Sequence, residues 1–440
     1  MDSQVAAQIV ANEWLKSIII DLKDLPPLSS NWSICKVPAK LRTKNKDAKS
    51  EVQADAYSPQ IVSIGPLHHG SKNLASMENF KTQYMSSLLY RTQNPAEVLE
   101  VFGRDFLDFD KNVRACYAES IGYSKEDLAK ILLRDGCFII ELFHRFCTPD
   151  PRKQNDPIFT TSWMLSTIQR DLALLENQVP FFVLEWLFNL TMRQKAISPS
   201  LVPLPVLALR FFKSNLNISE DTLNTTGAHF CHHLLDLIHK CYLPSSSKVE
   251  PKIKGESLEL IHCATALNKA GIKFRKDLSK NLLDLKFEDG VFKIPPLCVH
   301  DTTDSLFRNL IAFEQCYQCS AQYITSYFLL MDRLIDTASD VELLVHKRII
   351  ENDLGGSDDV SDLFNNICKQ VSLRDFHFAG LCEEVNAYYN KPWHKYKADL
   401  RSNYCRNPWT IISIIAGFWL LSLTTLQTVY TAIGYYPHKS

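Results

Sequence analysis

The densest group of side chains that could bind a metal lies between positions 229 and 241. It comprises His229, Cys231, His232, His233, His239 and Cys241. On a helix, positions 229 and 233 share one face, as do 232 and 239, and zinc binds imidazole and thiolate ligands. The intervening LLDLI pattern also gives the helix an ordinary apolar face, and no second ligand group has a recognisable spacing. A metal-binding regulator is therefore one hypothesis, and a buried helix without metal is the simpler interpretation.

Two further pairs of residues have types suited to catalysis. His68 and His69 follow the segment VSIGPL, and either could be the general base of a hydrolase. The sequence places no nucleophile beside them, so a turn with hydrogen-bonded histidines is the alternative. Cys316 and Cys319 form a C-x-x-C, but redox motifs of this kind need a helix N-terminus in a βαβ unit. Because this pair lies inside a helical pattern, we interpret it as core or surface cysteines.

Paired carboxylates are the remaining candidates. Asp108/Asp110 and Asp358/Asp359 are too generic in spacing to be given acid–base roles. The sequence therefore predicts no catalytic, cofactor-binding or metal-ligating residue and no cofactor.

Glycine usage and charge narrow the possible classes of protein. The chain has 14 glycines in 440 residues, less than half of the usual share of about 7%. It contains no G-x-G-x-x-G, no G-x-x-x-x-G-K-[ST] and no G-x-S-x-G, so dinucleotide, P-loop and α/β-hydrolase folds are disfavoured. The hydrophobic fraction of 46% indicates a folded protein. The net charge of -1 gives no reason to expect a nucleic-acid partner.

The thirteen cysteines are odd in number and scattered, which favours reduced thiols in a cytosolic compartment. The N-terminus begins with MDSQ and lacks a continuous apolar core, so it predicts an amphipathic helix and no signal peptide.

The C-terminal region differs from the rest in having a long uncharged run. The segment TIISIIAGFWLLSLTTLQTVYTAI, residues 410–433, would span about 36 Å as a helix. Trp409 lies at one end, and Tyr430, Tyr435 and Tyr436 lie at the other, as in an aromatic belt. The sequence therefore predicts a transmembrane helix over 409–434 with a short tail at 435–440, and a buried core helix is the alternative.

Charge next to this span predicts its orientation. Residues 391–408 are a basic juxtamembrane segment, which places the body in the cytosol by the positive-inside rule. We therefore expect a single-pass, tail-anchored protein whose lipid partner is the bilayer of a plasma membrane or endomembrane. The four N-x-[ST] sequons are predicted to carry no sugar in that topology; they lie at Asn31, Asn189, Asn217 and Asn224.

The remaining sequence predicts a mainly α-helical fold with one small β element. Residues 1–56 are expected to form a helix and an irregular basic loop, 57–243 a first helical lobe, 244–256 a linker, and 257–390 a second lobe. The β element lies near 271–300, where Asp289-Gly290 predicts a hairpin turn. Ser124 is a predicted N-cap, a helix is expected to run from Trp163 to Val179, and Ser339 with Glu342 suggests a capping box.

Several segments, taken in order, resemble a plant family known only as domain of unknown function 247. They are VPAKLR, YSPQIVSIGPLHHG, LLRDGCFIIELF, RDLALLENQVPFFVLEWLF, HLLDLI, HCATALNKAGIKF, FKIPPLCVHD, RNLIAFEQC, LIDTASDVELL, IIENDLG and NPW. The resemblance implies a plant-specific, mostly helical protein with one C-terminal span and no established catalytic residues. Some grass members are implicated in pollen-side self-incompatibility. The chain departs from the family at residues 44–56, where it carries extra polar residues, and at Leu67, where an aromatic residue is common.

These observations lead to one preferred function and two alternatives. We expect a non-enzymatic, membrane-anchored protein that recognises an unknown protein or peptide partner, of the self-incompatibility-determinant type. The alternatives are a hydrolase-like enzyme that uses His68 or His69 and a metal-binding regulator that uses the group from His229 to Cys241.

Overall fold

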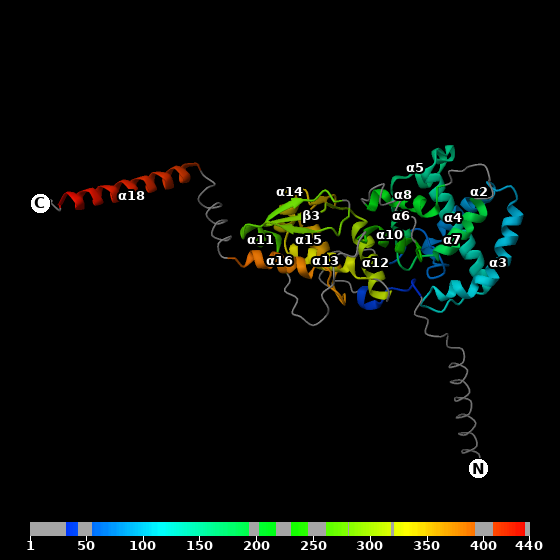
Figure 1. Cartoon of the computed structure of the whole chain (residues 1–440). Coiled ribbons are helices and arrows are strands. Elements are labelled where there is room, and N and C mark those ends of the chain that lie inside the picture. Colours follow the sequence, from blue (N-terminus) through cyan, green and yellow to red (C-terminus); the bar gives the residue numbers. More distant parts are fainter. Residues whose placement is uncertain are drawn as a thin grey trace, which may run out of the picture.

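The computed structural model describes residues 32–42, 55–192, 202–216, 230–244, 261–279, 281–317, 321–391 and 408–435. We call the described residues up to 244 the first lobe and residues 261–391 the second; both are mainly helical, and the two short sheets lie in the second (Figure 1). The predicted domain bounds stay predictions. The N-terminal helix, the basic loop from 43, most of the linker and of the juxtamembrane segment, and the tail from 436 lie outside the described residues.

A buried helix, α4 (Lys125–Cys147), is at the centre of the first lobe. Ser124 starts it as predicted, because its hydroxyl accepts the N–H of Asp127 at 3.0 Å. Residues 137–140 are fully buried, and burial of a side chain such as Phe138 contributes about 2–3 kcal/mol. The helices that contact α4 are α2 (Ser76–Leu89), α3 (Pro95–Ala115), α7 (Phe181–Met192) and α8 (Leu204–Leu216).

Shorter elements complete this lobe. They are the 3-10 turns η1 (Ala39–Arg42), η2 (Lys72–Leu74) and η3 (Pro151–Asn155), and the helices α5 (Pro157–Thr160), α6 (Ser162–Leu172) and α10 (Leu234–Tyr242). The prediction of a helix up to Val179 is wrong, because α6 ends at Leu172. The side chains of Asn177 and Gln178 instead bond to nearby carbonyls of Asp171, Leu172 and Leu174, which stabilises an irregular turn.

In the described part of the second lobe, a three-stranded and a two-stranded sheet lie among six helices. The strands are β1 (Lys273–Lys276), β2 (Lys286–Glu288), β3 (Val291–Ile294), β4 (Leu297–Val299) and β5 (Ile350–Asn352). The helices are α11 (Ala264–Lys269), α12 (Thr303–Cys316), α13 (Tyr323–Leu334), α14 (Ala338–His346), α15 (Ser357–Ile367) and α16 (Ala379–Tyr389). The capping box before α14 was predicted at the wrong residues, because Thr337 and Asp340 form it.

The predicted hairpin is confirmed. Strands β2 and β3 are antiparallel, and the turn between them has positive φ at Asp289 (50°) and Gly290 (73°). Strand β1 pairs parallel with β3, which gives the order β1-β3-β2, and β4 pairs parallel with β5. Pro295 and Pro296 separate β3 from β4 because proline has no N–H for a sheet ladder.

The C-terminal helix α18 (Pro408–Tyr435) lies beyond the second lobe (Figure 1). No helix in the described part of the chain is both long and apolar enough to cross a membrane. The predicted transmembrane helix at 409–434, and the single-pass membrane localisation based on it, are therefore wrong. The physical reason is the series of hydroxyl residues in α18, such as Thr424, Thr425 and Thr428, which dilutes its apolar residues and bonds to preceding carbonyls.

Candidate functional site

The segment 33–42, which we call the strap, lies where several of the predicted site residues come together. Residues 33–38 of the strap lie outside any helix, with Ile34 in a parallel bridge to Tyr117, and its last four residues form η1. The N–H groups of Ser33 and Ile34 both donate to the Cys116 carbonyl, at 3.1 and 3.0 Å. Since the rest of the strap contacts side chains from both lobes, it connects groups that are distant in the sequence.

Glu176 is the carboxylate at the centre of this region. Its side chain is 2% exposed and accepts the N–H of Val37, the guanidinium of Arg42 and Nε2–H of His68, the last at 3.0 Å. Burial raises the pKa of Glu176, but the bonds from His68, Arg42 and Val37 outweigh it and leave the pKa below its ordinary value. Arg42 also pairs with Asp55. The carboxylate is therefore a charged anchor for the strap.

His68, one of the two predicted general bases, is thus oriented by a carboxylate. A His–carboxylate pair resembles part of a catalytic triad, but hydrolysis also needs a nucleophile at the second ring nitrogen. Within the described ranges, no serine, threonine or cysteine side chain is hydrogen-bonded to the His68 ring. The geometry therefore places His68 in the structural contact that holds the strap.

His69, the other predicted base, packs against an aromatic ring. Its ring meets Tyr123 edge-on with centroids 5.7 Å apart, and the Tyr123 hydroxyl donates to the His69 carbonyl at 3.3 Å. Nδ1 of His69 is buried and has no hydrogen-bond partner, and burial lowers the pKa of this imidazole. The two histidines therefore have separate environments and do not form one site.

Residues 60–65 are held by a set of buried polar side chains that we call the clamp. Asp171 accepts three successive N–H groups, from Gln60, Ile61 and Val62, at 2.8 to 3.0 Å. Asn177 accepts the N–H of Ile64 at 2.7 Å and donates to the carbonyl of Val62 at 2.9 Å. These contacts satisfy backbone groups that would otherwise be buried without partners.

The clamp ends in a fully buried ion pair. Lys81 Nζ lies 2.6 Å from Asp135 Oδ1 and donates to the carbonyl of Ser63 at 2.8 Å. Asp135 also accepts the N–H of Gly65 at 2.8 Å. Both side chains of the pair are 0% exposed. The clamp was not identified from the sequence, because its acceptors were assigned to helices. The polar segment ENQ, residues 176–178, shortly before Pro180, was a signal that could have indicated it.

The histidines and cysteines between 229 and 241 do not converge on one point. His233 caps α10 through Nδ1 and donates from Nε2 to the carbonyl of Ser33, at 3.2 and 3.1 Å. His239 bonds to Glu314 at 2.8 Å, and His232 bonds to the hydroxyl of Tyr317 at 2.9 Å. Cys231 and Cys241 are buried, and His229 lies outside the described residues. No group that could hold a metal ion is found among the residues that the structure describes.

The remaining predicted residues have local roles or lie elsewhere. Cys316 ends α12 and is partly exposed, whereas Cys319 lies outside the described residues. Asp110 pairs with Arg114 at 2.9 Å, and Asp359 accepts the N–H of Gly356 at 3.3 Å in front of α15. Asp108 and Asp358 are exposed.

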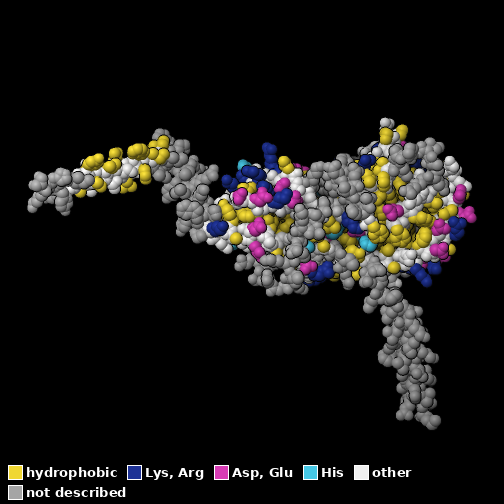
Figure 2. Space-filling model, viewed as in Figure 1, with side chains coloured by type: hydrophobic (Ala, Val, Ile, Leu, Met, Phe, Trp, Pro, Cys, Tyr) yellow, Lys and Arg dark blue, Asp and Glu magenta, His cyan; other side chains and the backbone are white. Residues whose placement is uncertain are grey.

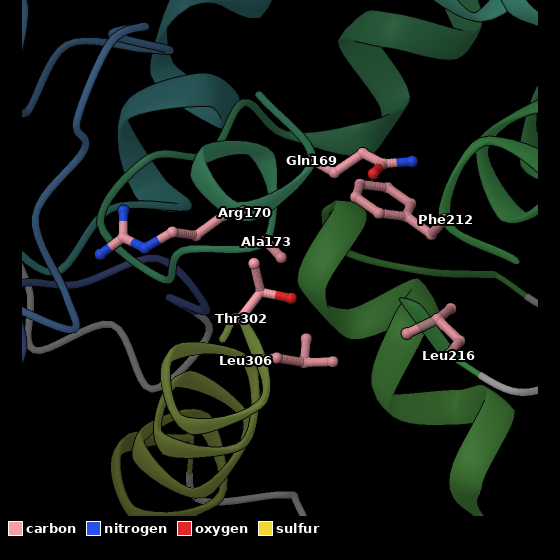
Figure 3. Close-up of a pocket in the computed structure, with 7 residues that line it drawn as sticks. All are labelled: Gln169, Arg170, Ala173, Phe212, Leu216, Thr302 and Leu306. Carbon is pink, nitrogen blue, oxygen red and sulfur yellow. The ribbon is translucent and has the colours of Figure 1, made fainter. Parts of the chain in front are cut away.

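A small cavity lies among α6, α8 and α12 (Figure 3). Its volume of about 10 Å³ is enough for roughly one water molecule. Figure 3 shows the guanidinium of Arg170 pointing away from Phe212 and Leu216, and it bonds to Asp171 at 2.8 Å. A substrate-sized ligand does not fit this cavity, which is lined by Gln169, Arg170, Ala173, Phe212, Leu216, Thr302 and Leu306.

Comparison with known proteins gives the class to which this helical body belongs. Residues 34–423 match the model of the family DUF247, described as plant protein of unknown function, and the chain belongs to that family. It is 32% identical over 412 residues to "UPF0481 protein At3g47200" of Arabidopsis thaliana, covering 87% of this chain and 84% of the relative. It is also 23% identical over 464 residues to "Putative UPF0481 protein At3g02645" of the same plant, covering 85% and 86%. No solved structure matches the chain.

Proposed function

We propose that the protein is a non-enzymatic recognition protein that binds an acidic segment of a protein partner through the outer face of its three-stranded sheet. The observation that carries the proposal is a row of three cations across the strands. The sheet register places Arg275 of β1 beside Lys293 of β3, and Lys293 beside Lys286 of β2. Lys273 lies on the same face, two residues before Arg275. We call these four residues the cation face.

The charges on this face are only partly compensated. Lys293 Nζ lies 2.6 Å from Glu288, and Lys286 Nζ lies 2.8 Å from Asp284. In the described part of the chain, neither Lys273 nor Arg275 has an ion-pair partner, and both are exposed. Figure 2 shows Lys and Arg side chains gathered over the strands of the second lobe, with acidic side chains among them. This arrangement leaves positive charge available to an anionic partner.

Protection of sheet edges does not account for the whole row. Lysine on an edge strand discourages pairing with other chains, and this could explain Arg275 on β1 and Lys286 on β2. Lys293, however, lies on the central strand β3. Like charges directly opposite each other on a sheet are unfavourable, so their presence here supports a binding role. The opposite face carries Phe274 and Phe292, which pack into the core.

The contacts of the predicted catalytic residues support the non-enzymatic part of the proposal. His68 uses Nε2 on Glu176, and the ring of His69 rests against Tyr123. The hydrolase that uses His68 or His69, the metal-binding regulator and the self-incompatibility role stay predictions.

The test is binding of a fluorescently labelled twelve-residue peptide rich in Asp and Glu to the full chain, followed by anisotropy. We expect saturable binding that weakens as salt is raised, since exposed charges are screened. The double variant Lys273→Glu with Arg275→Glu should weaken binding at least tenfold. The matched control, Lys125→Glu with Lys130→Glu on α4, makes the same change in net charge on exposed residues of the other lobe.

Three results would contradict the proposal. One is the absence of binding by the unmodified chain even at low salt. Another is an equal loss of affinity in the control and in the cation-face variant, which would mean that net charge alone attracts the peptide. A labelled single-stranded nucleic acid that binds more tightly than the peptide would also count against a protein partner.

A further inference from the structure

Helix α18 exposes more large hydrophobic side chains than any other element in the described part of the chain. Ten of them lie between Ile412 and Tyr430, and each is between 53% and 72% exposed. Figure 2 shows hydrophobic side chains along this helix, and Figure 1 shows the helix lying beyond the second lobe. A continuous apolar surface of this extent marks an interaction site, because exposed apolar residues otherwise lie singly.

Apolar residues recur along α18 at alternating intervals of three and four positions. The series, which we call the seam, is Ile412, Ile415, Trp419, Ser422, Leu426 and Val429. Ile433 continues the spacing in the sequence, so the series covers three heptads. This is the a/d repeat of a coiled coil, in which side chains of one helix fit into holes between side chains of another. The spacing therefore indicates that the partner of the seam is a helix.

The polar residues of α18 lie mostly away from the seam. Six of its eight Ser, Thr and Gln residues occupy positions b, c and f of the heptad, which face outward in a coiled coil. They are Thr410, Ser413, Thr424, Gln427, Thr428 and Thr431.

Ser422 is the polar residue within the seam. Its hydroxyl donates to the carbonyl of Phe418 in the same helix at 2.8 Å. The hydroxyl therefore keeps a hydrogen-bond partner when the seam is covered, which removes the main cost of burying it.

Charge decides which helix the seam fits. No Asp, Glu, Lys or Arg lies between Pro408 and Tyr435, so neither the seam nor the flanking e and g positions select an oppositely charged partner. A second α18 meets no like charge and offers a seam of the same length and spacing. We propose that two copies of this chain associate through α18, seam against seam, as a two-helix coiled coil. The contact is separate from the cation face and uses no residue of either lobe.

The experiment measures the mass of the full chain by light scattering during size-exclusion chromatography. The unmodified chain should have twice the mass of one chain. The double variant Trp419→Glu with Leu426→Glu places two carboxylates in the seam and should have the mass of one chain. The matched control, Leu420→Glu with Gln427→Glu, adds the same charge at the same spacing one residue further along, on the outer face, and should keep the double mass.

Urea unfolding of the two lobes should have the same midpoint in both variants, which shows that a loss of mass is not a loss of folding. The proposal is overturned if the unmodified chain has the mass of one chain at its highest soluble concentration. Equal dissociation of the seam variant and the control would also overturn it, because added charge alone would then separate the copies. So would loss of the double mass when the unmodified chain binds phosphatidylcholine vesicles, since a lipid surface would then be the preferred partner of α18.

Discussion

The clamp around residues 60–65 and the cation face of the sheet use charge in opposite ways. In the clamp, Lys81 and Asp135 are fully buried, and each has a partner from a distant part of the chain. On the cation face, Arg275 and Lys293 are neighbours of the same sign. Buried charge is tolerated only when it is paired and hydrogen-bonded, whereas exposed like charges cost little because water screens them. The clamp charges therefore stabilise the packing of residues 60–65, whereas the cation-face charges cost little stability and are available for the binding that we propose.

The largest expected effect comes from breaking the buried ion pair. Asp135→Ala removes the fully buried partner of Lys81 and leaves Glu78, whose side chain is 27% exposed, as the other ion-pair partner of Lys81; it should lower the free energy of unfolding by about 3 kcal/mol in urea titrations. The double variant Lys81→Met with Asp135→Leu should recover a large part of this loss. Lys130→Ala on the exposed surface is the control and should change stability by less than about 0.5 kcal/mol. A loss below 1 kcal/mol for Asp135→Ala would mean that the pair does not support the clamp.

Gly65, inside the clamp, is the next most sensitive position. Its φ is +72°, and an added Cβ would lie 2.4 Å from the Gln178 carbonyl oxygen. Gly65→Ala should therefore cost about 3 kcal/mol from backbone strain and overpacking, measured by urea unfolding. Gly70→Ala is the matched control, because Gly70 also has a positive φ of +82° but nothing lies within 4 Å of its Cβ position. Equal losses in the two variants would show that the close contact in the clamp has no effect.

His233 lies where the two lobes meet, against Ser33 and Phe313. The pH dependence of the free energy of unfolding therefore tests how much this histidine stabilises the boundary. Burial lowers the pKa of His233 from 6.5 to about 4, so the folded chain keeps this imidazole neutral while the unfolded chain takes up a proton. The stabilisation is complete above pH 6.5 and is lost as pH falls towards 4. Between pH 7 and pH 5 the chain should lose about 2 kcal/mol that depends on His233.

The measurement compares urea unfolding across this pH range in three chains. His233→Gln should be less stable at pH 7 and should show a flatter decline towards pH 5 than the unmodified chain. His346→Gln, an exposed position at the end of α14, should keep the original pH dependence. Parallel curves for His233→Gln and the unmodified chain would show that the boundary does not depend on a neutral His233.

The smallest expected change in the free energy of unfolding is on the cation face, and there the variant should be more stable than the unmodified chain. Arg275→Gln removes one of two adjacent like charges and should raise the free energy of unfolding by about 0.2–1 kcal/mol at low salt. The gain should shrink in 0.5 M salt, and Lys111→Gln, at an exposed position near the C-terminal end of α3, should show no gain. If Arg275→Gln destabilises the chain, the repulsion within the row is not significant and the contrast with the clamp weakens.

The sequence predicted the mainly helical class and several local features correctly because these depend on nearby residues. The N-cap at Ser124 and the turn at Asp289-Gly290 are examples. It failed where long-range contacts decide the structure. The segment 173–180 has helical propensity, but Asn177 bonds across to Ile64 and Val62, which come more than a hundred positions earlier.

The candidate site could be predicted only in part for the same reason. The residue type indicated His68, but its partner Glu176 is distant in sequence and has no motif. The C-terminal span was overestimated because the absence of charge was given more importance than the many hydroxyl groups.

The three N–H groups held by Asp171 have a consequence for the order of events during synthesis. Gln60, Ile61 and Val62 leave the ribosome 109 to 111 residues before the carboxylate that binds them. At translation rates of about 5–20 residues per second, this segment waits roughly 5–20 s for its acceptor. During that interval its apolar residues Ile61, Val62 and Ile64 are exposed without their native partners. The first lobe should therefore depend on chaperones until Asp171 and Asn177 have emerged.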